Sequence, residues 1–393
     1  MIILSGFAII LVNCYRKAIT VEARTILDRG VSLSTSEVNT IGPKDAFTEN
    51  HNINLGLIRK RIKNDSLQFK EFVVGSRSLT KVTIGYIDDI VLKDSLDIVL
   101  EKIKNIEIYA VLDTGYIRDF LVSDSRTHFP TVIHTERPDV AVASLLEGKI
   151  VILVENSPFS IVIPGYLNDF IHASEDSYQK AHNVTMTRIL RFIAFNLTIF
   201  LPGFYIAITT FNQEVIPDTL LTSLSVQREV VPFPTSFSVF ILMITFEILR
   251  ECDMRIPETM GTSISIVGAL VLGEAVVNAG IVSPIVVLVV AISSITGMIF
   301  SDLEMVNALR WWKLLFILFS SFMGLIGFLS ISLIFINTLC SIDIFGISYL
   351  VPFSPFIKDS MDDTFYVEPR NKMKFRPGYL TKNLKRLRGK YEK

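Results

Sequence analysis

The stretch ILRFIAFNLTIFLPGFYIAITT, residues 189–210, decides the fold class of this chain. It contains one charged residue, Arg191, and about 20 mainly apolar residues are enough for a helix to cross a bilayer. Arg188 and Arg191 at its start favour a cytoplasmic N-terminal end, because Lys and Arg are enriched in cytoplasmic loops. The loop 211–231 has three acidic residues against Arg228 alone, so we expect it on the opposite side.

Further apolar segments follow toward the C-terminus. Residues 233–249 can return through the bilayer, with Arg250 and Arg255 at the cytoplasmic end. The remaining segments are a hairpin at 264–282 and 284–300, the longest predicted span at 313–337, and a stretch at 339–356 interrupted by Gly346, Pro352 and Pro355. Together they predict about four to six spans, the last segment being either re-entrant or a short final crossing. An even total places both soluble ends in the cytoplasm.

Hydrophobicity is distributed unevenly along the 393 residues. Half of the residues are apolar and the mean hydropathy is +0.47, too high for one ordinary soluble domain. Residues up to about Lys180 are nevertheless rich in charge. The sequence therefore predicts an α/β soluble N-terminal domain followed by an all-α multi-pass transmembrane domain. We expect an N-terminal region at 1–41, a cytoplasmic α/β domain at 42–185, transmembrane helices at 186–357 and a basic cytoplasmic tail at 358–393.

The net charge of −1 says little about partners, because a mixed-charge front half is balanced against a basic tail. The tail has a single acid after residue 369, Glu392, and its bases are Arg370, Lys372, Lys374, Arg376, Lys382, Lys385, Arg386, Arg388, Lys390 and Lys393. Such a tail beside a membrane span favours attraction to anionic lipid. Nucleic-acid binding is disfavoured, since no aromatic stacking platform accompanies the charge.

The soluble half alternates strand and helix patterns. Residues 71–75, 80–87, 107–113, 149–156 and 159–163 are rich in β-branched and aromatic residues and predict strands. A helix is expected within 88–105. A second, short helix is expected after Pro138, with Asp139 as its cap and its end near Gly148. Residues 1–13, MIILSGFAIILVN, are short for a span, and a buried helix or an imperfect start of the reading frame fits them better than an anchor.

Motifs for catalysis or metal binding are missing from the sequence. It contains no phosphate-binding loop, no nucleophile elbow, no HExxH and no dinucleotide fingerprint. His128 and His134 have no Cys or acid at metal spacing, and Cys14, Cys252 and Cys340 are too dispersed for a zinc site or a disulfide framework. We therefore expect no enzymatic activity, cofactor or metal. For Arg137 and Asp139 in TERPD, a helix start with a local ion pair is favoured over catalysis.

Polar residues within the hydrophobic hairpin are the candidate functional residues. Glu274 and Asn278 lie one turn apart in VLGEAVVNAG, and a carboxylate facing lipid is costly, so Glu274 should face a protein interior or a water-filled path. A buried subunit contact and a pore lining explain it equally well. The small or turn-forming residues around them, which predict close helix packing or self-assembly, are Gly268, Gly273, Gly280 and Pro284. Nearer a membrane face, Glu247 and Arg250 are spaced for an ion pair at a helix end.

An ordered set of strings resembles the A subunits of the GerA-type spore germinant receptors. In the soluble half they are GPKDAFTEN (42–50), LIRKRI (57–62), FPTVIHTERPD (129–139), LLEGKIVILVENSPF (145–159) and SEDSY (174–178). In the membrane half they are LPGFYIAITTFNQEVIP (201–217), VPFPTSF (231–237), FEILRECDMRIPETMG (246–261), SIVGALVLGEAVVNAGIVSP (265–284) and FGISYLVPFSP (345–355). The set covers nearly everything from Gly42 onward, in family order.

The resemblance implies an A subunit in the spore inner membrane that works with a transporter-like B subunit and a lipoprotein C subunit. It implies that several copies form an ion-conducting path that opens when a nutrient binds. By this analogy the motif residues serve folding, subunit contact and gating; they are Thr135, Glu136, Arg137, Pro138, Asp139, Glu247, Arg250 and Glu251. Two departures stand out. Only about forty residues precede Gly42, so 1–41 is expected to be a shortened or degraded region, and Glu274 replaces what the family pattern gives as Gln.

Two other classes of protein are weighed against a receptor subunit. A single-chain secondary transporter is compatible with apolar segments broken by Gly and Pro, but four to six spans are few and no paired repeat is evident. A membrane-tethered enzyme acting through the soluble half has no motif in its favour.

Overall fold

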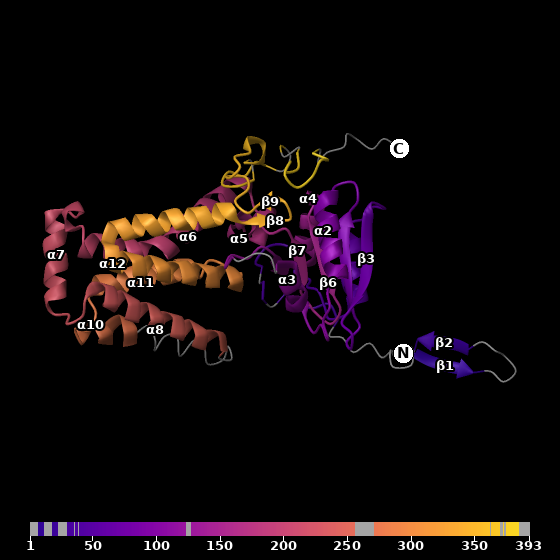
Figure 1. Ribbon diagram of the computed structural model, residues 1–393, viewed down its shortest axis with the longest axis horizontal. Helices are drawn as coiled ribbons and strands as arrows, with labels where there is room; N and C mark the ends of the chain where they lie inside the picture. The colour runs from indigo at the N-terminus through magenta and orange to yellow at the C-terminus, as the bar shows by residue number, and fades with distance from the viewer. Residues whose placement is uncertain are drawn as a thin grey trace.

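The computed structural model has two parts, an α/β domain and a set of long helices that extend away from it (Figure 1). The structure describes residues 7–11, 18–22, 30–34, 36–37, 39–122, 127–255, 271–361, 363–369, 372 and 375–384. The predicted α/β character of the N-terminal part is confirmed.

The α/β domain is built on an antiparallel sheet in the order β3-β4-β6-β7-β5. Its strands are β3 (Leu67–Val74), β4 (Thr80–Ile87), β5 (Ile133–Thr135), β6 (Ile150–Val154) and β7 (Ser160–Ile163). β6 reads IVILV and is buried throughout, as expected for β-branched residues covered on both faces of a sheet. The predicted strand at 107–113 is wrong. There the chain forms no ladder and instead hydrogen-bonds to the β3–β4 turn, from Ser76 N to Ile108 O and from Arg77 N to Tyr109 O.

Helices cover both faces of this sheet. Ile150, Ile152 and Val154 pack toward α2 (Lys93–Lys104) and α3 (Thr114–Val122). Val151 and Leu153, which point to the opposite face, pack toward α1 (His51–Arg61) and α4 (Pro138–Glu147). α4 begins at Pro138, so the predicted cap at Asp139 is wrong: Arg137 precedes the helix and Asp139 lies in its first turn. The predicted end is confirmed, since Gly148 follows α4 with φ of 107°. The short helices α5 (Leu167–Ile171) and η2 (Ser174–Tyr178) then lead out of the domain.

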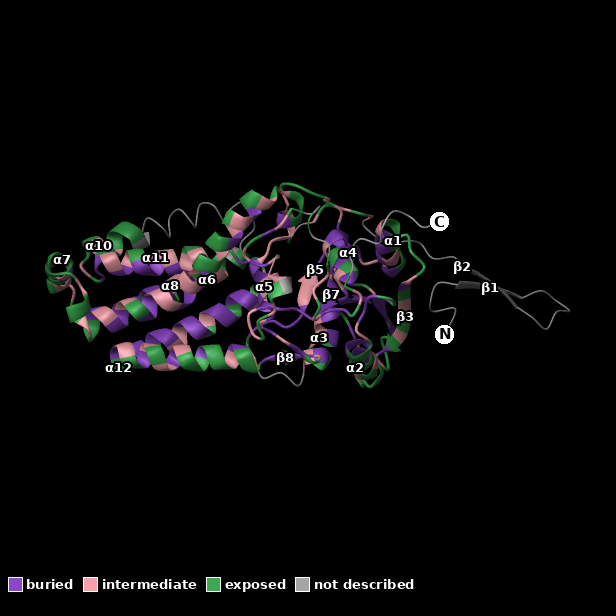
Figure 2. Cartoon of the chain, turned by 90° about the horizontal axis from the view of Figure 1, so that it is seen from above, coloured by how far each residue is buried: buried purple, intermediate pink, exposed green. Residues whose placement is uncertain are grey.

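The second part consists of long helices that run alongside one another (Figures 1 and 2). They are α6 (Ala181–Thr210), α8 (Thr235–Arg255), α11 (Pro284–Gly297) and α12 (Leu303–Ser341), with α7 (Asp218–Glu229) at the end farthest from the α/β domain. A π-helical turn at Val271–Ala275 and α10 (Val276–Asn278) precede α11. α6 and α12 are long and apolar enough to cross a membrane, whereas α11 is apolar but has only 14 residues.

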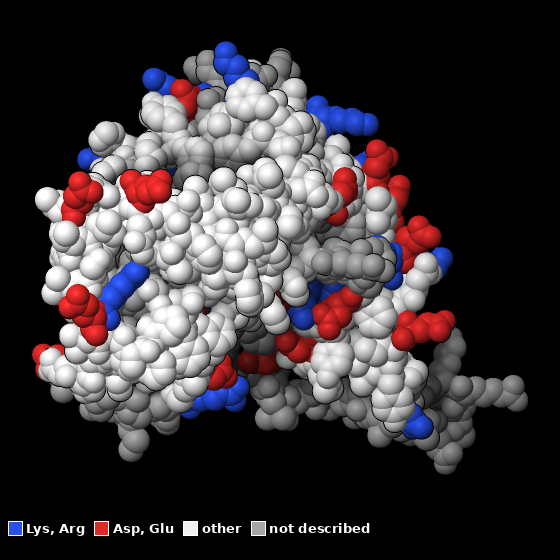
Figure 3. All heavy atoms as spheres, turned by 60° about the vertical axis from the view of Figure 1, so that its left-hand side comes forward, with Lys and Arg blue, Asp and Glu red and all other residues white. Residues whose placement is uncertain are grey.

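The outer faces of these helices are largely uncharged. Large apolar side chains such as Phe322, Ile326 and Leu333 are exposed on α12. Seen from the α7 end, the helical part presents a broad area without Lys, Arg, Asp or Glu, with charged residues toward its edge (Figure 3). A surface of this kind is far larger than the scattered apolar residues of an ordinary soluble protein.

α12 is two helices rather than one. The backbone at Gly324 has φ 58° and ψ −134°, so the chain turns there and the second half returns along the first. Trp312 accordingly packs edge-on to Phe335, with ring centroids 4.9 Å apart, and Phe316 lies 5.4 Å from Phe328. The prediction of one long span at 313–337 is therefore wrong, because apolar residues on both sides of the turn hide it from a hydropathy pattern.

The segment after α12 returns to the α/β domain. β8 (Asp343–Ile344) and β9 (Ile347–Ser348) form a small hairpin, and Tyr349 O accepts from Leu167 N at 3.2 Å. The prediction of a re-entrant segment or a short crossing at 339–356 is wrong, since these turns pack against the domain. Farther on, Thr381 donates to Ile90 O and Arg376 to Leu146 O. Within the described residues, Lys358, Lys372, Arg376 and Lys382 are the bases of the predicted tail; the others lie outside them.

The N-terminal apolar run forms β1 (Phe7–Leu11), which pairs antiparallel with β2 (Ala18–Glu22). The helix expected in residues 1–13 is therefore wrong for Phe7–Leu11, where the β-branched pair Ile9 and Ile10 favours a strand.

Candidate functional site

Three of the motifs in the soluble half meet around one buried guanidinium group. Arg137 precedes α4 and its side chain is 1% exposed. Its Nε lies 3.0 Å from Asp139 Oδ1 and its Nη2 lies 2.6 Å from Asp139 Oδ2, so the predicted ion pair is confirmed. Nη2 also donates to Pro43 O at 3.3 Å, and the Tyr178 hydroxyl donates to Asp139 Oδ2 at 2.6 Å. TERPD thereby holds GPKDAFTEN and SEDSY together.

Glu136, the neighbour of Arg137, fixes the segment that precedes Gly42. Its Oε1 accepts from the Ser34 hydroxyl, from Ser36 N at 2.7 Å and from Glu37 N at 3.0 Å. Burial acts to raise the pKa of Glu136, but these hydrogen bonds to its charged form outweigh burial and lower the pKa. Thr135 donates in turn to Glu37 Oε2 at 2.7 Å.

The carboxyl group of Glu37 is the titratable group of this cluster. Burial raises its pKa to about 7, although the hydrogen bond from Thr135 acts in the other direction. A pKa that is higher in the folded than in the unfolded state contributes stability that is complete below the unfolded value, near 4.5, and is lost as the pH rises through about 7.

We therefore expect the melting temperature of the full chain to fall between pH 4.5 and pH 7 relative to that of Glu37→Gln, in which the carboxyl is replaced by a neutral isostere. Thermal unfolding of both proteins over this range measures the difference. A difference that stays constant with pH would contradict the shift.

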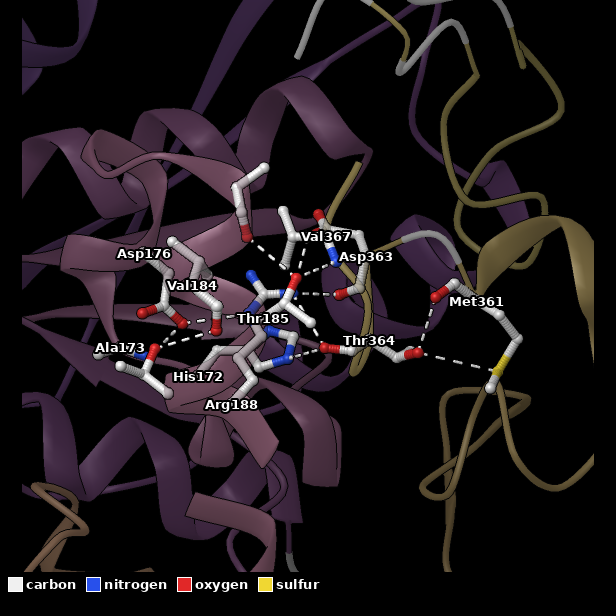
Figure 4. A network of polar contacts seen from close by, with 12 residues as sticks. His172, Ala173, Asp176, Val184, Thr185, Arg188, Met361, Asp363, Thr364 and Val367 are labelled. Atoms are coloured by element: carbon white, nitrogen blue, oxygen red, sulfur yellow. Dashed lines mark hydrogen bonds and ion pairs between the residues drawn. The ribbon is translucent and has the colours of Figure 1, made fainter. Parts of the chain in front are cut away.

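A second polar cluster joins the start of α6 to the segment after α12 (Figure 4). Asp176 pairs with both nitrogens of the Arg191 fork, at 2.7 and 3.0 Å, and with Arg188 Nε at 3.2 Å. The Nη1 atom of Arg188 contacts the segment after α12, where it donates to Asp363 Oδ1 at 2.9 Å and to Thr364 O at 3.1 Å. Charge-assisted bonds of this kind are about twice as strong as neutral ones.

His172 lies beside this cluster with its Nε2 3.2 Å from Thr364 O. Burial, together with the neighbouring Arg188, lowers the pKa of His172 well below its usual value. The ring is therefore neutral near pH 7, and a second positive charge is kept away from Arg188.

The two clusters form one connected structure, which we call the junction network: Arg137, Asp139, Asp176, Tyr178, Arg188 and Asp363. Tyr178 and Asp176 belong to the same short helix, so the network runs from the α/β domain to α6 and on to the C-terminal segment. From the sequence, Arg188 and Arg191 were expected only to orient the first span in the membrane. The sequence could have indicated an ion-pair cluster here, because the acidic motif SEDSY is followed by two arginines one helical turn apart.

The predicted pore or subunit-contact residues lie elsewhere. Gly273, Glu274 and Asn278 are exposed in the single chain, around the π-helical turn and α10. Gly280 has φ of 65° and lies against Val230 at the end of α7, and Pro284 is the first residue of α11. Gly268 lies outside the described residues. These residues are therefore near the α7 end of the helices, far from the junction network (Figure 1).

The predicted Glu247–Arg250 ion pair is wrong. Glu247 Oε2 instead lies 2.6 Å from Arg310 Nε, and Oε1 lies 3.1 Å from Lys313 Nζ, so α8 is joined to α12. Glu251 pairs with Arg255 at 2.7 Å on the exposed side of α8. The cations of α12 are more than fifty residues away in sequence, so helical spacing could not reveal them.

No group of three or more His, Cys, Asp or Glu side chains in the described part of the chain is arranged to hold a metal ion. His128 stacks on Trp311, with ring centroids 5.5 Å apart. His134 is largely buried, and burial lowers its pKa to about 4. The two histidines thus contribute to packing in this structure.

Comparison with known proteins gives a consistent family. The model of the Bacillus/Clostridium GerA spore germination protein family matches residues 1–379. Spore germination protein KA of Bacillus subtilis (strain 168) is 36% identical over 98% of this chain and 71% of its own length. Spore germination protein XA of Bacillus anthracis is 34% identical over 95% and 76%, and spore germination protein GerLA of Bacillus cereus is 32% identical over 100% and 80%.

Among solved structures, the crystal structure of the N-terminal domain of the A subunit of the Bacillus megaterium spore germinant receptor GerK3 is 34% identical. It covers 30% of this chain and 93% of that chain, with a TM-score of 0.25. The whole-length family match and the long, similar relatives lead to one conclusion: the chain belongs to the Bacillus/Clostridium GerA family of spore germination proteins.

Proposed function

We propose that this chain is the A subunit of a nutrient-gated germinant receptor in the spore inner membrane, and that several copies form the ion-conducting path. The observation that carries the proposal is that Glu274 and Asn278 are exposed in the single chain although their segment, VLGEAVVNAG, is mainly apolar. In the proposed topology Glu274 belongs to a segment that crosses the bilayer, where a carboxylate against lipid is costly unless a water-filled path or a neighbouring subunit covers it. Further copies of the chain supply both.

A membrane topology with an even number of crossings supports this arrangement. Thr381 and Arg376 contact the α/β domain, and Asp363 contacts Arg188 at the start of α6, so both soluble ends lie on one side. The proposed crossings are α6, α8, α11, the two halves of α12 and the apolar segment 264–282, of which the structure describes residues 271–282. Arg188, Arg191, Arg250 and Arg310 lie at the end nearest the α/β domain, which favours the cytoplasm for that end.

The junction network gives the helices a mechanical connection to the soluble domain. Arg188 is charge-paired on both sides, with the buried Asp176 and with Asp363, which is 44% exposed. We infer that a displacement of the α/β domain is transmitted to α6 through these contacts. We infer that a transporter-like B subunit and a lipoprotein C subunit act on the chain in this complex, with the nutrient sensed outside it.

The test is ion flux from vesicles that contain this chain together with its B and C subunits. We expect nutrient to open a cation flux in these vesicles and to have no effect on vesicles that contain this chain alone. Nutrient uptake by this chain alone would instead indicate a single-chain secondary transporter.

A further inference from the structure

A cavity of about 180 Å³ opens between α6, α8, α11 and α12 at the end nearest the α/β domain. Each of these helices contributes to its polar lining, which consists of Thr198, Glu247, Arg250, Ser293, Ser294, Arg310 and Lys313. The rest of its wall is apolar. In the topology above, this is the level at which the bilayer meets the cytoplasm.

The charges around the cavity do not balance. Among the described residues that line the cavity, Glu247 is the one carboxylate, and its two oxygens lie next to Arg310 and Lys313. Within the residues that the structure describes, Arg250 forms no ion pair, although it is only half-exposed and shares the wall with Arg310 and Lys313. Three cations thus surround a single anion in a partly buried space, which is costly unless a further negative charge enters.

A hydroxyl group in the same wall also lacks a partner. Ser294 Oγ is buried and makes no hydrogen bond to any described residue. The adjacent Ser293 donates to Thr198 O at 2.9 Å. This bond already joins α11 to α6, so the Ser294 hydroxyl is not needed for that contact. A buried hydroxyl without a partner is unusual, and an oxygen atom of a ligand would complete it.

The surface outside the cavity is suited to acyl chains. Ile248 on α8 and Ile295 and Met298 on α11 are each about 60% exposed beside the lining residues. Trp311 is 55% exposed at the same level, and Trp is enriched where hydrocarbon meets water.

We propose that this cavity binds an oxyanion of the phosphate class, with Arg250 as its main ligand and Ser294 as a hydrogen-bond donor. The headgroup phosphate of an anionic lipid and free inorganic phosphate share this chemistry. A bound phosphate balances the excess positive charge of the cavity and bridges α8 to α11. The inference concerns this cavity alone and holds whether or not the chain conducts ions.

The experiment is native mass spectrometry of the full chain, stripped of lipid in detergent and titrated with phosphatidylglycerol or phosphatidylcholine. We expect preferential binding of phosphatidylglycerol, weakened about tenfold by Arg250→Gln and about threefold by Ser294→Ala, because bonds to charged groups exceed neutral ones. Arg255→Gln is the matched control on the same helix, since its side chain is 78% exposed, and it should change binding less than about twofold.

A parallel titration with inorganic phosphate, followed by thermal unfolding, distinguishes the two sources. Phosphate that stabilises the wild type but not Arg250→Gln assigns the site to a free anion, whereas an effect of the lipid alone assigns it to a headgroup. Equal binding of both lipids without a phosphate effect, or equal losses in Arg250→Gln and Arg255→Gln, would overturn the proposal. Circular dichroism checks that each variant is folded, and Ser294→Ala provides the test if Arg250→Gln is not.

Discussion

Arg137→Met is expected to destabilise the α/β domain by about 3–5 kcal/mol, because removing one partner of a buried ion pair leaves the other charge uncompensated. The side chains of Arg137 and Asp139 are 1% and 7% exposed, so water cannot replace the lost guanidinium. The contact to Pro43 is lost as well. Unfolding of the full chain, with hydrogen exchange read at α4 and at residues 39–48, measures the effect.

Arg61→Met is the matched control for this substitution. Arg61 also pairs with both oxygens of an aspartate, through Nη2 to Asp45 Oδ1 and Oδ2 at 2.6 and 2.7 Å, but both side chains are about a quarter exposed. Its loss should cost about 1 kcal/mol or less. The double variant Arg137→Met with Asp139→Leu should recover part of the stability, since no unpaired charge remains. Equal losses at Arg61 and Arg137 would show that burial does not set the cost.

Gly324→Ala is expected to destabilise the helical part by about 2–5 kcal/mol, from backbone strain and overpacking together. The φ of 58° with ψ of −134° belongs to a region that is essentially restricted to glycine. A Cβ atom at this position would also lie 2.6 Å from Phe211 Cβ and 2.7 Å from its Cγ. The turn between the halves of α12 would have to shift, and with it the packing of Phe316 on Phe328.

Gly56→Ala provides the comparison for Gly324→Ala. Gly56 lies within α1, and nothing is within 4 Å of the position that its Cβ would occupy. Alanine there should be neutral or stabilising by up to about 1 kcal/mol. Thermal unfolding of both variants in the same detergent gives the contrast. A Gly324→Ala protein as stable as the wild type would mean that the turn is not held in this conformation.

Local patterns predicted the elements whose signals are local. The strand at Thr80–Ile87 is period-2 and β-branched, and Gly148 follows the last residue of α4, so the strand and the end of the helix were predicted correctly. The Arg137–Asp139 pair was predicted too, because its members are two residues apart. The prediction of a strand at 107–113 was wrong because this segment hydrogen-bonds to the β3–β4 turn instead of pairing in the sheet. That contact is tertiary, so a local sequence pattern cannot reveal it.

The turn at Gly324 was missed for a quantitative reason. Residues 313–337 fit a single span of roughly 30 Å, so length raised no objection. The helical run is in fact 39 residues, roughly 58 Å if straight, which is about twice the hydrocarbon thickness. A helix that also included residues 303–312 would be too long for one span, so it would have to break. Gly324 lies near the middle of this run and was the candidate for the break.

The candidate site was only partly accessible from the sequence. The motifs TERPD and SEDSY were recognised, but their contacts join residues about forty to one hundred and eighty positions apart. The ion-pair partners of Glu247 were missed for the same reason. Helical spacing predicted Arg250, whereas the folded chain brings Arg310 and Lys313 to this carboxylate. The exposure of Glu274 is likewise a property of the folded chain.

Ion selectivity of Glu274→Gln tests the proposed path most directly. The measurement is the ratio of cation to anion flux, after addition of nutrient, from vesicles that contain the chain with its B and C subunits. We expect the wild type to favour cations, since an exposed carboxylate lines the path, and Glu274→Gln to lose most of that preference while the complex stays assembled. A nutrient-opened flux with the same selectivity in both proteins would contradict a path lined by Glu274.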